Sequence, residues 1–258
     1  MLLAIDAGNT DIVFGLYDGQ SWLHQWRVPS REAPSTEAWQ YRLVSELFEK
    51  GIQLGDVKQA IISSVVPDLT QPLAAMLRQA NGIEALIVGP EVYPQLELEV
   101  LNPDQIGTDL VANALAAYHR YKDHCIVVDF GTALTFTTIS AEASILGVAI
   151  APGLKTAIRS LFQDTAQLPE VPLQVPESAI GKNTIHAIQA GTMLGYIGMV
   201  THLLQYIKEE LSAPDCKVVA TGGLSSVLKP LSTQFDRIDP LLTLDGLVLI
   251  DAQARQHT

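Results

Sequence analysis

The sequence of 258 residues is poor in charge, and in positive charge above all. Only 17% of the residues are charged, and 16 Lys and Arg stand against 28 Asp and Glu, a formal net charge of −12. Because binding to nucleic acid or to an anionic membrane depends on clustered basic side chains, this balance argues against both kinds of partner. The apolar share of 48% excludes a disordered chain, so we expect a globular protein.

Long apolar runs and cysteine pairs are also missing. No segment approaches the roughly 18 apolar residues of a membrane-spanning helix. The apolar start is broken by Asp6 and has no basic flank, so we expect no signal peptide. Cys125 and Cys216 lie far apart outside any Cys-x-x-Cys motif. Two buried thiols in a reducing cytoplasm are therefore expected, rather than a disulfide or a metal pair.

What the sequence does contain is one pattern that occurs twice. Short apolar strands alternate with helical periodicity, which predicts an α/β fold. Leu3–Thr10 and Val127–Ala133 are both apolar strands that end in Asp-x-Gly, and a second apolar strand follows each of them. The aspartates lie about half a chain apart. The repetition predicts a duplicated fold whose hairpins face a cleft, with a boundary inside the helix Asp109–Tyr121. A chance pair of similar turns is the alternative.

The first hairpin, Asp6–Asp11, has the residue types of a phosphate-binding turn. Gly8 lets backbone come close to a ligand, and successive N–H groups of such a turn can point at phosphate oxygens. Asp6 at the strand end could hold Mg²⁺ through waters. An ordinary hairpin uses the same residues, but the repetition at Asp129–Thr132 favours a nucleotide. The Gly222-Gly223 turn after strand Val218–Thr221 could approach a flat base, or is a plain tight turn.

A second candidate is Asp109, at the expected start of a helix whose buried face has helical spacing. Thr108 or Asp109 could simply cap this helix. The functional interpretation makes Asp109 the acceptor of a proton from a substrate hydroxyl, as an aspartate does in other kinases. We expect the helix terminus to keep this carboxylate ionised and weakly basic, which is adequate when positioning and charge stabilisation dominate catalysis.

A third segment, Gly181–Thr184, precedes a helical stretch from Ile185 to about Leu211, with Asn183 as the expected N-cap. The N–H groups there could bind an anion. This stretch holds Gly191, Gly195 and Gly198, which each weaken an exposed helix by about 1 kcal/mol relative to Ala. We expect another backbone to lie against them, either across a dimer or between the two halves of the chain.

Seven segments occur in an order that resembles the type III pantothenate kinases, of the acetate/sugar kinase, Hsp70 and actin superfamily. The segments are Asp6–Thr10, Ser63–Pro67, Asn102–Asp109, Val128–Ala133, Ile150–Leu154, Gly181–Thr184 and Thr221–Gly223. The resemblance spans nearly the whole chain. It implies a duplicated ribonuclease H-like (actin-like ATPase) fold with two similar halves, 1–117 and 118–258, around a nucleotide cleft.

The resemblance also implies an activity: a cytoplasmic homodimer that phosphorylates pantothenate to 4′-phosphopantothenate with ATP and Mg²⁺, the first step of coenzyme A biosynthesis. Asp109 would be the catalytic base. Asp129 would hold a monovalent cation, K⁺ or NH₄⁺. The ATP contacts would be Asp6, Ala7, Gly8, Asn9, Thr10, Asp11, Ile12, Val13 and Thr132. The pantothenate pocket would include Val100, Gly107, Thr108, Asp109, Leu110 and Thr184.

Two positions depart from the family pattern. The family usually has Arg directly after the catalytic Asp, where this chain has Leu110, and often Tyr two positions before the Asn-Pro, where it has Val100. Both changes remove polar groups from the expected pocket, one of them a cation that could pair with a carboxylate. Two alternatives therefore stay open: a non-catalytic regulatory relative, and a kinase for another small hydroxyl compound.

Overall fold

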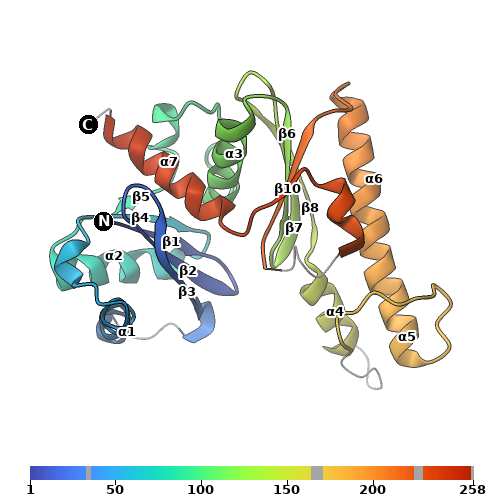
Figure 1. The fold of residues 1–258 in the computed structure, drawn as a ribbon, viewed down its shortest axis with the longest axis horizontal. Helices are drawn as coiled ribbons and strands as arrows, with labels where there is room; N and C mark the ends of the chain where they lie inside the picture. Colours follow the sequence, from blue (N-terminus) through green and yellow to red (C-terminus); the bar gives the residue numbers. More distant parts are fainter. Residues whose placement is uncertain (33–35, 164–170, 224–228, 257–258) are drawn as a thin grey trace. The chain divides into compact units, whose positions relative to one another are not determined.

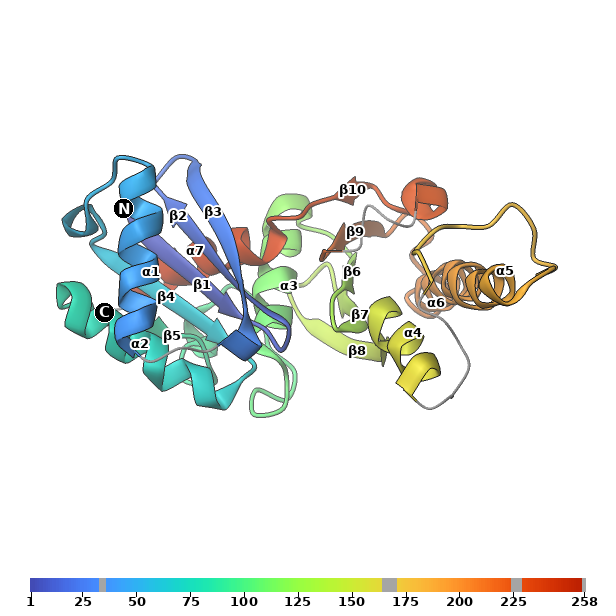
Figure 2. The same cartoon turned by 90° about the horizontal axis from the view of Figure 1, so that it is seen from below.

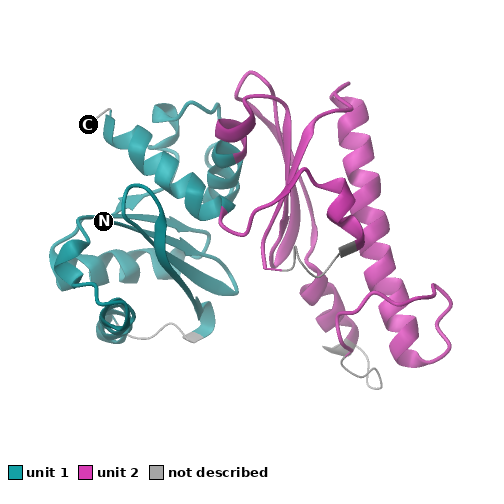
Figure 3. Ribbon diagram, viewed as in Figure 1, with its two compact units in different colours: residues 1–116, 242–258 teal, residues 117–241 magenta. Residues whose placement is uncertain are grey.

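The computed structural model describes residues 1–32, 36–163, 171–223 and 229–256 (Figure 1). The chain divides into two compact units (Figure 3). Unit 1 comprises residues 1–116 and 242–258, and unit 2 comprises residues 117–241. The division falls within helix α3 (Thr108–Tyr121), and the C-terminal helix α7 (Leu242–Gln256) belongs to unit 1.

Unit 1 is built on a five-stranded mixed sheet in the order β3-β2-β1-β4-β5. Its strands are β1 (Leu2–Ala7), β2 (Asp11–Tyr17), β3 (Trp22–Pro29), β4 (Gln59–Ser64) and β5 (Leu86–Ile87). Its other helices are α1 (Thr36–Glu49), α2 (Pro67–Asn81) and the short η1 (Ser30–Glu32), η2 (Leu54–Asp56) and η3 (Tyr93–Gln95). Strand β1 pairs antiparallel with β2 and parallel with β4, as a hairpin followed by a helical crossover requires.

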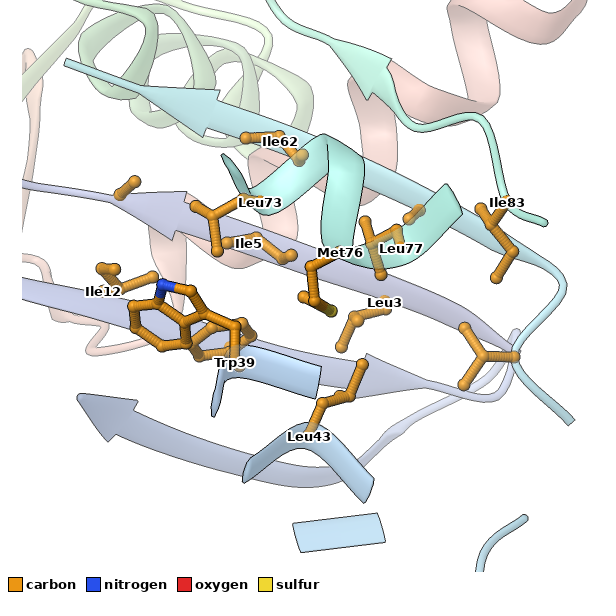
Figure 4. Close-up of a cluster of buried hydrophobic side chains, with 14 of the residues drawn as sticks. Leu3, Ile5, Ile12, Trp39, Leu43, Ile62, Leu73, Met76, Leu77 and Ile83 are labelled. Atoms are coloured by element: carbon orange, nitrogen blue, oxygen red, sulfur yellow. The ribbon is translucent and has the colours of Figure 1, made fainter. Parts of the chain in front are cut away.

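The core of unit 1 lies between one face of this sheet and helices α1 and α2 (Figure 4). Because side chains alternate along a strand, Leu3 and Ile5 of β1 point to this face together, where they meet Trp39 of α1 and Met76 of α2. Helix α7 contacts β1 and β4. Gly246 lets it approach α3 closely, because an added Cβ there would overlap the backbone of Ala112.

Unit 2 repeats the sheet of unit 1. Its order, read from β8, is β8-β7-β6-β9-β10, and β6 pairs antiparallel with β7 and parallel with β9. Its strands are β6 (Cys125–Phe130), β7 (Ala133–Ile139), β8 (Ile145–Pro152), β9 (Lys217–Thr221) and β10 (Arg237–Ile238). Asp6 and Asp129 are each the fifth residue of the central strand. The predicted duplication is therefore confirmed in strand order, direction and register.

The helices of unit 2 cover one face of its sheet, where Phe136, Val200 and Leu204 are fully or almost fully buried. They are α4 (Leu154–Gln163), α5 (Thr184–Gln189), η4 (Ala190–Leu194), α6 (Gly195–Glu210) and the short η5 (Lys229–Gln234). Figure 2 shows α5 and α6 following one another along one line. The predicted helical stretch from Ile185 to about Leu211 is confirmed, and it contains one π-helical turn, η4. There the Thr192 hydroxyl donates to the carbonyl of Ile188 at 2.6 Å.

The glycines of this helical stretch have open space beside them within unit 2. Apart from the helix itself, no described residue of unit 2 would lie within 4 Å of a Cβ added at Gly191, Gly195 or Gly198. The expected contact between the two halves of the chain stays a prediction. The other expectation, a second copy of the chain, is not tested by a single chain.

The cysteines agree with the sequence analysis. Cys125 and Cys216 are both free and buried. Burial raises the pKa of the Cys125 thiol to about 12 and that of Cys216 to about 11, so both are inert at neutral pH. Among the helices that the structure describes, none combines the length and the apolar composition needed to cross a bilayer.

Candidate active site

The first hairpin turn is held in shape by the strand beside it. The N–H of Gly8 donates to the carbonyl of Asp11 at 3.0 Å, which closes the turn. Ser30, the first residue after β3, donates its hydroxyl to the Gly8 carbonyl at 2.6 Å and its N–H to the Thr10 carbonyl at 2.8 Å. With these carbonyls occupied and Asn9 exposed, the tip of the turn presents polar groups to solvent. The predicted turn is present, and Ser30 is a support that its sequence pattern did not reveal.

Asp6 is linked to the start of helix α3 by one buried hydroxyl. Ser63 is the neighbour of Asp6 in the parallel pair β1–β4 and is completely buried. Its hydroxyl donates to Asp6 Oδ1 at 3.0 Å and lies 2.9 Å from Oγ1 of Thr108, the first residue of α3. Three residues far apart in the sequence therefore form one hydrogen-bonded chain, and two of them, Asp6 and Thr108, are predicted site residues.

Asp109 lies in the first turn of α3, as predicted, and its surroundings are unusual. Oδ1 accepts a hydrogen bond from the N–H of Leu110 at 2.9 Å. A Cβ added at Gly107 would overlap this same oxygen, so the absence of a side chain there makes room for the carboxylate. Burial raises the pKa of Asp109, and its hydrogen bonds to backbone N–H groups only partly offset this. The pKa of Asp109 is therefore shifted in the direction opposite to the one that we expected from the helix terminus, because desolvation outweighs these hydrogen bonds.

A buried tyrosine shares this environment. Tyr93 is 4% exposed, and its hydroxyl has no hydrogen-bond partner among the described residues. Burial and then the charge of Asp109 raise the pKa of Tyr93 to about 12, so it is a neutral phenol at physiological pH. Leu110 is buried and Val100 half-buried. Nothing in the sequence pattern singled out Tyr93, since a Tyr before Pro in a loop has no periodicity that points to a site.

The second hairpin turn, in unit 2, is also fastened by its neighbours. The Thr132 carbonyl accepts the N–H of Gly153 at 3.0 Å and the hydroxyl of Thr156 at 2.9 Å. Gly153 is required here, because an added Cβ would overlap the carbonyls of Gly131 and Thr132. Thr132 is exposed at the tip of this turn. The turn therefore presents its polar tip to solvent, as the first hairpin does.

Asp129 lies among hydroxyl groups and close backbone. In register it stands between Thr221 of β9 and Thr135 of β7, both of which are buried. The Thr135 hydroxyl has no partner among the described residues. Gly222 has φ +88°, and an added Cβ would lie 2.5 Å from Asp129 Oδ1. This position therefore requires glycine both for its backbone conformation and for the space beside the carboxylate.

The third predicted segment is an exposed helix start. Asn183 caps α5 as predicted, since its Oδ1 accepts the N–H of His186 at 2.9 Å, and Thr184 is exposed.

The predicted site residues divide between the two units. Unit 1 brings together Asp6, Thr108 and Asp109, whereas Asp129, Thr132 and Thr184 belong to unit 2. The described residues contain no cluster of three His, Cys, Asp or Glu side chains that could hold a metal by themselves.

The chain is similar to known proteins over nearly its whole length. The profile of the family described as type III pantothenate kinase matches residues 2–206. A type III pantothenate kinase of Geobacter sulfurreducens is 39% identical over 258 residues, which cover 99% of this chain and 100% of that protein. Another, from Moorella thermoacetica, is 40% identical over 250 residues, with 97% and 98% covered. The structure of MreB 5 of Spiroplasma citri bound to AMPPNP is similar in fold, with a TM-score of 0.57, 11% identity, and 99% and 97% of the two chains covered.

Proposed function

This chain belongs to the type III pantothenate kinase family, and we propose that Asp109 is the base through which it phosphorylates pantothenate. The reaction converts pantothenate and ATP into 4′-phosphopantothenate and ADP and is the first step of coenzyme A biosynthesis. The observation that carries the proposal is the room that Gly107 leaves for the Asp109 carboxylate at the start of α3.

Asp109 would accept the proton of the pantothenate 4′-hydroxyl while the alcohol oxygen attacks the γ-phosphorus of ATP. The new O–P bond forms as the bond between the γ-phosphorus and the bridging oxygen breaks, and ADP leaves. The raised pKa makes Asp109 a better proton acceptor than an ordinary carboxylate. Gly107, Thr108, Leu110 and Val100 would line the pantothenate pocket, together with Thr184.

The two hairpins would hold the phosphates of ATP. Their carbonyls are occupied by internal hydrogen bonds, which supports a role for the turns in presenting N–H groups and polar side chains to anions. The contacts would come from Asp6–Val13 and from Thr132. Ile12 is fully buried in the core of unit 1, so its contribution would be made by the backbone. The Gly222-Gly223 turn would approach the base.

The metal ions of the proposal fit the residues present. Mg²⁺ is commonly bound by one or two carboxylates plus substrate phosphates, and Asp6 at the end of β1 offers one carboxylate beside the phosphate turn. A monovalent cation needs oxygen donors. Thr135 lies next to Asp129 in register, and its hydroxyl has no partner among the residues that the structure describes. Mg²⁺ would neutralise charge that develops on the phosphates, while Asp6 and Asp129 would set where each ion lies.

We further propose that the enzyme is a cytoplasmic homodimer whose interface includes the helical stretch with Gly191, Gly195 and Gly198. The open space beside these glycines supports close approach of a second copy. Two buried, reduced cysteines support a reducing compartment.

A coupled assay of ADP release tests the function. We expect turnover with pantothenate, ATP and Mg²⁺ that increases when K⁺ or NH₄⁺ is added. The variant Asp109→Asn should lose on the order of a hundredfold or more in kcat while still binding ATP, as expected for loss of a general base. Asp104→Asn, on the exposed turn before α3, is the matched control and should keep its activity. No turnover with pantothenate, or an unchanged kcat in Asp109→Asn, would contradict the proposal.

A further inference from the structure

Ser63 occupies a position that an apolar residue would be expected to fill. It follows Ala60, Ile61 and Ile62 on β4, and all four side chains are completely buried. A buried hydroxyl is costly unless its hydrogen bonds are made, and here both are made: one to Asp6 and one to Thr108. Its two partners lie 57 and 45 positions away in the sequence, so the contact joins three separate segments of unit 1.

The direction of these hydrogen bonds follows from the chemistry of the three groups. An ionised carboxylate only accepts, so the single proton of Ser63 Oγ is donated to Asp6 Oδ1. Ser63 Oγ must then accept, and Thr108 Oγ1 must donate, across the 2.9 Å between them. The chain therefore runs from Thr108 through Ser63 to Asp6. With its proton committed, Thr108 Oγ1 is left as an acceptor, next in the sequence to Asp109.

The duplicated unit repeats the position of this buried hydroxyl. Thr221 is the register partner of Asp129 on β9, as Ser63 is the partner of Asp6 on β4. Thr221 is 1% exposed, so a hydroxyl residue is buried beside the strand-end carboxylate in both units.

We propose that Ser63 is a positioning residue that sets the Asp6 carboxylate and the start of helix α3 in fixed relation to one another. It touches neither substrate. It acts through Asp6, which lies at the phosphate turn, and through Thr108, whose neighbour Asp109 receives the proton. The role rests on the proposed function of Asp6 and Asp109. It predicts that loss of the Ser63 hydroxyl lowers kcat more than it raises either KM, because alignment of the two substrates is worth large factors in rate.

The test is a comparison of kinetics and unfolding in the full-length protein. Ser63→Ala removes the hydroxyl, and Ser63→Cys keeps nearly the same shape but has only a weak hydrogen-bond donor. Ser63→Thr keeps a hydroxyl and places at this position the residue type that unit 2 has at Thr221. Ser64→Ala is the matched control, because Ser64 is the next residue of β4 and its hydroxyl bonds locally with Val66. It donates to the Val66 carbonyl at 2.9 Å and accepts the Val66 N–H at 3.2 Å. The double variant Ser63→Ala/Thr108→Val measures whether the two hydroxyls act together.

We expect kcat to fall at least about tenfold in Ser63→Ala and Ser63→Cys, the cost of about 1.4 kcal/mol of alignment. Ser63→Thr should recover most of the activity, and Ser64→Ala should match the wild type. The double variant should lose no more than the more damaged single variant. Equal activity of wild type and Ser63→Cys, or losses that multiply in the double variant, would overturn the positioning role. An inactive wild type would overturn the proposed function itself, and this role with it.

Discussion

Gly107 and Asp109 are matched in the structure: the space that a side chain at Gly107 would fill is occupied by Oδ1 of Asp109. The same oxygen accepts the N–H of Leu110 at 2.9 Å. The observed position of the carboxylate therefore depends on a glycine two residues earlier. A single small substitution at Gly107 should therefore change the orientation of the proposed base.

Gly107→Ala should lower kcat by at least about tenfold with little loss of stability. The new methyl group meets the movable end of a side chain rather than backbone, so Asp109 rotates away while the fold adapts. Steady-state kinetics and thermal unfolding measure the two effects. Gly55→Ala is the control, because an added Cβ there meets no described residue within 4 Å. Full activity in Gly107→Ala would show that the carboxylate does not need this orientation.

Asp109→Asn should be more stable than the wild type at neutral pH, although it is inactive. A raised pKa means that the folded protein holds the proton more tightly than the unfolded chain, so ionisation above that pKa destabilises the fold. Asn removes this penalty and keeps the oxygen that accepts the Leu110 N–H. Thermal unfolding should show the gain at pH 8, and the gain should shrink as pH falls through the folded pKa towards the ordinary value. A variant that is less stable at pH 8 would contradict the desolvation of Asp109.

The pH dependence of turnover should also reflect the raised pKa of Asp109. Asp109 must be ionised to accept a proton, and burial raises its pKa above the ordinary value of an aspartate. The acid limb of kcat should therefore lie at higher pH than an exposed aspartate would give, with activity constant above it. Initial rates measured from pH 4 to pH 8 with a coupling system that remains active throughout test this. An acid limb at the pH of an ordinary aspartate would contradict it.

Tyr93→Phe should leave stability unchanged or raise it by up to about 1 kcal/mol, because the buried hydroxyl that it removes has no partner among the described residues. Tyr196→Phe is the matched comparison. Tyr196 is similarly buried, but its hydroxyl donates to the Pro152 carbonyl, so its loss should cost about 1 kcal/mol. Denaturant unfolding of both variants measures the difference. Equal destabilisation would mean that the Tyr93 hydroxyl is bonded in solution.

Gly246→Ala should destabilise the protein by about 1–3 kcal/mol or more, because its Cβ would overlap the backbone of Ala112 where α7 meets α3. Backbone cannot rotate away as a side chain can, so the helices must separate. Ala252→Ser, on the exposed side of α7, should change stability by less than about 0.5 kcal/mol. Denaturant unfolding compares them. A neutral Gly246→Ala would contradict this packing of α7.

Local patterns in the sequence were enough to predict much of the fold. The alternation of apolar residues gave the strands around Asp6 and Asp129, and the turn residues between strands gave both hairpins. The same pattern, found twice, led to the duplication that the two sheets confirm. These features are encoded within about fifteen residues of one another, where side-chain period and turn chemistry act directly.

The tertiary structure decided what depends on distant segments. No local pattern indicated that α7 belongs with the N-terminal sheet, that Ser63 joins Asp6 to Thr108, or that Tyr93 is buried near Asp109. The sequence identified Asp109 as the start of a helix, but its basicity was set by the surroundings that folding assembles around it. The spacing of apolar residues and the residue types of a turn depend only on residues that are close in the sequence. The desolvation of Asp109 and the hydrogen bonds of the Ser63 hydroxyl depend on residues that only the packed fold brings together.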